Sequence, residues 1–237
     1  DDLVLISGSV RDLQKMIDLC ISEITSLDLK INVKKSVCLR IGNNHKTFCK
    51  NLLINGSVIP WSNQLTYLGI TIKSASKFIV EFKPNRVKFY RAFNSLYGKI
   101  CKANEQLIVS LMKTFCIPLS MYGLDAINLN VSALKSLDNL LYNAFGKIFK
   151  TFNHEILSSC MYYMNCQPLR FDYYSRRLNF LSKLNRSENS VTKTWFEING
   201  KNEQSNLAKM LNVDINSRDL KRDVWNRFAS TLDIVPS

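Results

Sequence analysis

The sequence predicts an α+β fold, with a small antiparallel sheet and one packed helix first and helices alone after them. Short apolar runs separated by turn residues occupy positions 30–72. Beyond residue 80, apolar residues recur every three or four positions instead, which is the period of an amphipathic helix. The chain has 237 residues, 46% of them hydrophobic, enough for one large domain or two small ones.

The first element expected is a strand over residues 3–7, because this apolar run is too short for a helix. A helix over residues 10–27 should follow. Ser9 is a good N-cap residue with Asp12 three positions later, and the apolar residues beyond it keep to one helical face.

Further strands are predicted from short apolar runs at 30–33, 36–41, 52–59 and 65–72. Asn55-Gly56 divides the third run into a two-residue hairpin, because both turn positions need a positive φ. Gly69 lies inside the last run, where a missing side chain permits a bulge or a close backbone approach.

Helices are expected at 84–102, 107–122, 132–149 and 169–184. Helical spacing places Phe115 and Leu119 on the apolar face of the second of these, which Pro118 should kink. The polar, Asn-rich segment 185–237 is expected to be loosely packed, with a weaker helix at 219–232.

The net charge of +13 is concentrated in one part of the chain. Residues 29–104 contain fourteen Lys and Arg and one acid, Glu81, while the charges outside this segment balance. Such a field attracts polyanions, and nucleic acid is the commonest large one inside cells. A solvated basic surface without a partner is the alternative. An anionic membrane is a weaker one, because the basic residues lie among strand-like segments and not along one helix face.

The seven cysteines are scattered, odd in number and contain no Cys-x-x-Cys pair, which favours buried thiols in a reducing compartment. No apolar run of about 18 residues appears, and the first residues lack the pattern of a secretory signal. We therefore expect an intracellular protein of the nucleus or cytoplasm that does not associate with a membrane.

Three short motifs are candidates for chemistry. Asp1 and Asp2 precede the first apolar run, and at a tight turn such carboxylates can converge on the divalent ions used in phosphoryl transfer. Lys35 follows the first helix, where a cation could neutralise departing pyrophosphate. Tyr67, Leu68 and Gly69 offer a backbone that a nucleic-acid strand could approach. Taken singly, each motif favours a structural role: solvated acids, an exposed turn lysine and a core strand with a bulge.

The order of these motifs, followed by a basic aromatic helix, resembles the reverse transcriptase of non-LTR retrotransposons, beginning inside the Tyr-Ala-Asp-Asp motif. The resemblance is specific over about residues 1–75. It implies that Asp1 and Asp2 bind two Mg²⁺ ions, that Lys35 lines the nucleotide phosphates as a further catalytic residue, and that Tyr67, Leu68 and Gly69 form the primer grip.

The same resemblance implies three regions: the rear of the polymerase palm at 1–80, a helical thumb at 81–150 and a helical extension at 151–237. The partners implied are an RNA template, a DNA primer and deoxynucleoside triphosphates, and the reaction is RNA-directed nucleotidyl transfer. The thumb residues expected to contact nucleic-acid phosphates are Lys83, Arg86, Lys88, Arg91, Lys99 and Lys102. The aromatics between them are predicted to face the core, because Tyr90, Phe93 and Tyr97 share an apolar face; stacking on bases is the alternative.

The family also needs an aspartate from an earlier palm strand and fingers that bind template and nucleotide, and neither is in this sequence. We therefore expect the chain alone to be inactive, as a fragment of a polymerase. The alternatives are a non-catalytic remnant that binds nucleic acid through residues 29–104, and a helical interaction module whose charge is incidental.

Overall fold

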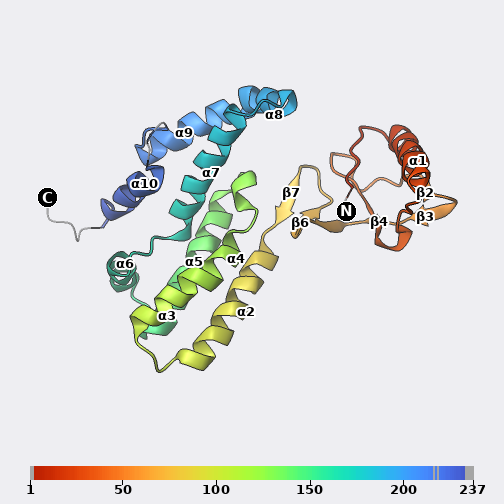
Figure 1. Cartoon of the computed structure of the whole chain (residues 1–237). Coiled ribbons are helices and arrows are strands. Elements are labelled where there is room, and N and C mark those ends of the chain that lie inside the picture. Colours follow the sequence, from red (N-terminus) through yellow and green to blue (C-terminus); the bar gives the residue numbers. More distant parts are fainter. Residues whose placement is uncertain (1–2, 216, 218, 233–237) are drawn as a thin grey trace. The chain divides into compact units, whose positions relative to one another are not determined.

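The computed structural model describes residues 3–215, 217 and 219–232, and the chain divides into two compact units, 1–82 and 83–237 (Figure 1). The first contains small sheets and one long helix, and the second is helical. The predicted α+β class is confirmed. Within the described residues, no helix combines the length and apolar character needed to cross a bilayer.

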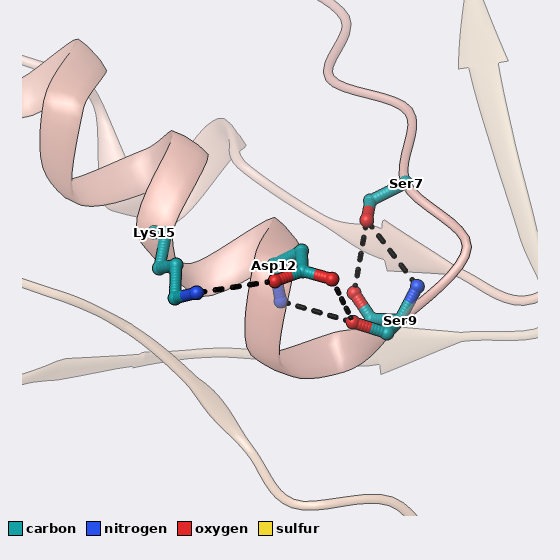
Figure 2. A network of polar contacts seen from close by, with 4 residues as sticks. All are labelled: Ser7, Ser9, Asp12 and Lys15. Atoms are coloured by element: carbon teal, nitrogen blue, oxygen red, sulfur yellow. Dashed lines mark hydrogen bonds and ion pairs between the residues drawn. The ribbon is translucent and has the colours of Figure 1, made fainter.

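Helix α1, Val10–Ser26, begins where the capping residues predict. The Ser9 hydroxyl accepts a hydrogen bond from the Asp12 amide at 3.1 Å and donates one to the Asp12 carboxylate at 2.8 Å, as Figure 2 shows. Lys15 pairs with the same carboxylate at 3.4 Å. These contacts lower the pKa of Asp12, the bond from Ser9 most. The serine therefore fixes the first turn of the helix.

A small apolar cluster holds the first unit together. Its buried members come from α1 and from three of the short strands: Ile17, Cys38, Leu52, Ile54 and Ile59. Leu5 and Val33 are partly buried against it. The cluster explains why α1 forms next to these strands, since its apolar face has no other surface to cover.

The strands form three separate sheets. Their members are β1 (Cys38–Leu39) with β4 (Trp61–Ser62), β2 (Leu52–Ile54) with β3 (Ser57–Ile59), and β5 (Gln64–Tyr67) with β6 (Ile70–Lys73) and β7 (Ile79–Glu81). The first pair is parallel and the others are antiparallel. The prediction of one small antiparallel sheet is therefore wrong in its pairing, because the strands divide among three sheets and β1 pairs in parallel with β4 beyond the β2–β3 hairpin.

Two hairpins turn on pairs of positive-φ residues. Asn55 (φ 47°) and Gly56 (φ 79°) connect β2 to β3 as predicted. Leu68 (φ 46°) and Gly69 (φ 77°) connect β5 to β6 in the same way. The single strand predicted at 65–72 is therefore wrong: Gly69 is a turn residue, and its apolar neighbours belong to two strands.

Two other predicted strands do not form. The described residues of the first apolar run are irregular, and Leu3, Val4 and Ile6 are exposed. At 30–33 the backbone instead enters a 3₁₀ turn, η1 (Val33–Lys35), which the Asn32 side chain caps. An apolar run becomes a strand only when a neighbour pairs with its backbone groups, and no described strand pairs with either run.

The second unit is built from helices, and all four predicted over 84–184 are present. The first part contains α2 (Lys83–Ile100), α3 (Glu105–Leu111), η2 (Met112–Cys116), α4 (Ile117–Met121), η3 (Leu124–Ala126) and α5 (Val131–Phe149). The remainder contains α6 (His154–Tyr163), α7 (Leu169–Asn185), α8 (Ser190–Trp195), η4 (Phe196–Gly200), α9 (Lys201–Leu211) and α10 (Leu220–Ala229). Helix α2 packs beside α4 and α5, and α7 contacts α5, α9 and α10 (Figure 1).

The described residues after 185 pack more closely than predicted. Leu211, Leu220 and Val224 form a buried cluster with Leu178 of α7. The polar residues that suggested loose packing include helix caps: Asn189 accepts two backbone bonds at the start of α8, and Asn212 ends α9 in the left-handed region. Two of the asparagines in this segment therefore lie at helix boundaries.

The kink expected near Pro118 is a π-turn. The backbone N–H of Ile117 bonds to the Met112 carbonyl, five residues earlier. This wider turn keeps Met112 and Cys116 in the core, while Phe115 is 59% exposed. The prediction that Phe115 and Leu119 face the core is wrong, because it assumes an unbroken period of 3.6 residues.

Candidate nucleic-acid interface

The predicted metal ligands, Asp1 and Asp2, lie outside the described residues. The segment that follows them is anchored at Leu5, which packs against the apolar cluster of the first unit. Val33, in the turn that contains Lys35, packs against the same cluster. The segment after the aspartates and the turn bearing Lys35 therefore share one small core.

Lys35 is exposed at the end of turn η1. Its backbone N–H donates to the Asn32 side-chain oxygen at 3.3 Å, and Ser36 closes the turn with a 2.9 Å bond to the Asn32 carbonyl. The turn fixes the backbone while the lysine side chain faces solvent. This geometry suits a cation that meets a phosphate arriving from solution.

Tyr67, Leu68 and Gly69 form the tip of the β5–β6 hairpin. Leu68 is 58% exposed there, and Thr66 and Thr71 face each other across the strands with their hydroxyls 3.2 Å apart. Beyond the hairpin, Glu81 pairs with Lys73 of the same sheet. Glu81 is the only acid in the sequence of the basic segment, residues 29–104.

Helix α2 carries the predicted phosphate-contacting residues. Lys83, Arg86, Lys88, Arg91 and Lys99 on the helix, and Lys102 just after it, are all exposed. The helix contains no acid. A positively charged surface therefore runs the full length of α2, and side chains of this kind contact nucleic-acid backbones.

The aromatic residues of α2 pack toward the protein interior. Phe89 and Phe93 are buried and stack with ring centroids 6.1 Å apart. The Tyr90 hydroxyl accepts a bond from Asn143 at 2.9 Å, and the Tyr97 hydroxyl donates to the Lys147 carbonyl at 3.0 Å. Both tyrosines are thereby tied to α5, as expected for residues on the core-facing side of the helix.

Lys147 of α5 joins the charged surface of α2, although the sequence did not indicate it. Its ammonium lies 4.8 Å from the ring centroid of Tyr97 and donates to Asn94 at 3.1 Å. The two helices are some fifty residues apart in sequence, and only their packing brings this lysine to α2. No local pattern could have identified it.

Asn85 fixes the first turn of α2. Its buried side-chain amide donates to the carbonyls of Ser120 at 3.2 Å and Tyr122 at 3.0 Å, at the end of α4. These bonds give a hydrogen-bond donor to two carbonyls that have no intrahelical partner at the end of a helix. The charged helix is therefore attached firmly to the fold beneath it.

The His, Cys, Asp and Glu side chains of the described part of the chain do not converge on a metal site. No group of three His, Cys, Asp or Glu is placed to hold a metal among these residues. All seven cysteines are free. Burial raises the pKa of Cys116 to about 11 and that of Cys166 to about 12, so both remain neutral thiols at physiological pH.

Comparison with known proteins finds no family model, no curated protein and no solved structure that matches this chain.

Proposed function

We propose that the chain binds nucleic acid through the exposed cations of α2 and is part of a reverse transcriptase of the non-LTR retrotransposon type. One observation carries the binding proposal: a helix of 18 residues with exposed lysines and arginines along its length, no acid, and a core-facing side that fixes it to α4 and α5. The order of the sequence motifs supports the polymerase assignment.

In this proposal, unit 1–82 corresponds to the rear of the palm, and the helices after it to the thumb and an extension. Asp1 and Asp2 are proposed ligands of two Mg²⁺ ions, which would activate the primer hydroxyl and stabilise the leaving oxygen. Lys35 would neutralise the pyrophosphate side, and Tyr67, Leu68 and Gly69 would position the primer. The partners proposed are RNA template, DNA primer and deoxynucleoside triphosphates, in the nucleus or cytoplasm.

A binding experiment tests the role of α2. The triple variant Lys88→Ala, Arg91→Ala, Lys99→Ala should bind a labelled primer–template at least tenfold more weakly in a fluorescence anisotropy titration at low salt. The matched control, Lys193→Ala, Lys201→Ala, Lys209→Ala, removes the same charge from exposed positions on α8 and α9. Equal losses in the two variants would show that net charge alone binds the duplex. The absence of wild-type binding would favour a helical interaction module.

A synthesis experiment separates the polymerase from a non-catalytic remnant. Restoring an upstream segment with the fingers and the earlier aspartate should give magnesium-dependent DNA synthesis on an RNA template, and Asp1→Ala should abolish it. Synthesis that survives in this variant would remove the proposed metal role. A restored protein that binds primer–template but incorporates no nucleotide would support the remnant.

A further inference from the structure

Three large apolar side chains are exposed along η2 and the end of α4. Phe115 is 59% exposed, Leu119 39% and Tyr122 54%. Phe115 lies in η2, Leu119 in α4, and Tyr122 directly after the last residue of α4. The π-turn directs Phe115 and Leu119 outward although the sequence period would bury them, so the backbone itself creates this surface. We call these three residues the α4 strip.

The surroundings of the α4 strip are positively charged. Between Glu81 and Asp125 the sequence contains seven lysines and arginines and one acid, Glu105. The Lys88 ammonium lies 6.0 Å from the centroid of the Tyr122 ring, at the edge of cation–π range. The strip therefore meets the cations of α2 at Tyr122, next to Lys88.

We infer that the α4 strip is a stacking platform for the bases of single-stranded nucleic acid whose phosphates contact α2; the inference rests on the proposed function. Every base offers a π-face to an aromatic ring, and a basic surface beside exposed rings is the usual design of single-strand binding sites. The aromatics of α2 are occupied in the core. Phe115 and Tyr122 are partly exposed rings in the same unit, and Tyr122 lies beside Lys88 of α2.

The test uses the full chain with a labelled oligo(dT) strand and a blunt duplex of equal length. Phe115→Leu and Tyr122→Leu keep apolar surface but remove the ring, so each should weaken strand binding about tenfold. The slope of log affinity against log salt should stay unchanged, because no phosphate contact is lost. Phe152→Leu, at a ring that is 83% exposed elsewhere in the same unit, is the control. Circular dichroism melting verifies that each variant is folded.

Unchanged strand binding in both folded variants would overturn the stacking platform. If the duplex still binds and still responds to the α2 triple variant, the proposed function survives that result. Sedimentation provides a second test. Self-association that Phe115→Leu abolishes, with strand binding unaffected, would show that a second copy of the chain covers the α4 strip and would also overturn the inference.

Discussion

At the scale of single residues, the helical unit depends on a buried arginine. Arg177 of α7 is 2% exposed, and its guanidinium binds the Glu203 carboxylate through two bonds of 2.7 Å. A third bond of 2.9 Å reaches the Asp125 carbonyl. The arginine therefore connects α7 to α9 and to turn η3. A buried charge of this kind is tolerated only while its partners remain.

Replacing Glu203 tests this dependence. Glu203→Gln leaves the guanidinium buried without a counter-charge, so we expect a loss of about 3–5 kcal/mol in the free energy of unfolding. Urea denaturation followed by circular dichroism measures it. Glu197→Gln, at an exposed acid six residues earlier in η4, should change stability by less than about 0.5 kcal/mol. Similar losses in the two variants would contradict the account.

Because Asp172 of α7 is buried, we expect the free energy of unfolding to depend on pH. Burial raises its pKa, opposed by a 2.7 Å bond from Gln167 and by the charges of Lys221, Arg176 and Lys113. The folded state therefore holds this proton at pH values where the unfolded chain has released it. This contribution to stability is fully present below the unfolded pKa, near 4, and is lost as pH rises through the raised folded pKa.

The variant Asp172→Asn keeps an oxygen that can accept the Gln167 bond but cannot titrate. The fall in unfolding free energy as pH increases above about 4 should therefore be shallower than in the wild type. Urea denaturation across this range gives the comparison. Glu188→Gln controls for the loss of one surface carboxylate. A steeper fall in Asp172→Asn would contradict the assigned direction.

At the scale of elements, two π-turns shape the helical unit, and each has a local cause. Pro118 accompanies the first, at Met112–Cys116, since proline cannot continue the bonding of a regular helix. The second, Phe196–Gly200, brings the Phe196 ring over Gly200. A Cβ built on this glycine would lie 2.5 Å from the ring. The second turn therefore requires a glycine at position 200.

Two glycine-to-alanine substitutions should change the stability of the fold in opposite directions. Gly200→Ala forces the buried Phe196 ring to move, at a cost of about 1–3 kcal/mol. Gly98→Ala, in the exposed interior of α2 with nothing within 4 Å of the added Cβ, should gain about 0.5–1 kcal/mol from helix propensity. Thermal melts of both variants measure the difference. A stabilised Gly200→Ala would contradict the packing described for η4.

Periodicity and capping residues predicted the long helices well, and Asn55-Gly56 predicted its hairpin. The same reasoning failed where the chain departs from a regular period. The face assigned to Phe115 depended on 3.6 residues per turn, and η2 is wider. It also failed for short elements: the ten-residue α6 buries only Leu157 and Met161, too few positions to produce a clear pattern.

At the scale of the whole molecule, charge distribution is the property that the sequence predicts most completely. The exposed cations of α2 are those expected from the basic segment. Two features could not be predicted from local patterns. Lys147 reaches this surface from α5 through helix packing, and the turn at Gly69 depends on how β5 and β6 pair. The predicted metal pair, Asp1 and Asp2, lies outside the described residues and stays a prediction.

The salt dependence of primer–template affinity tests the central claim, that α2 binds a nucleic-acid backbone. Each phosphate neutralised contributes about 0.9 to the slope of log affinity against log salt. The wild type should therefore give a steep linear decrease, and the variant Lys88→Ala, Arg91→Ala, Lys99→Ala a slope shallower by about 2–3. A wild-type affinity independent of salt, or equal slopes in the two proteins, would contradict the assignment of α2 as the interface.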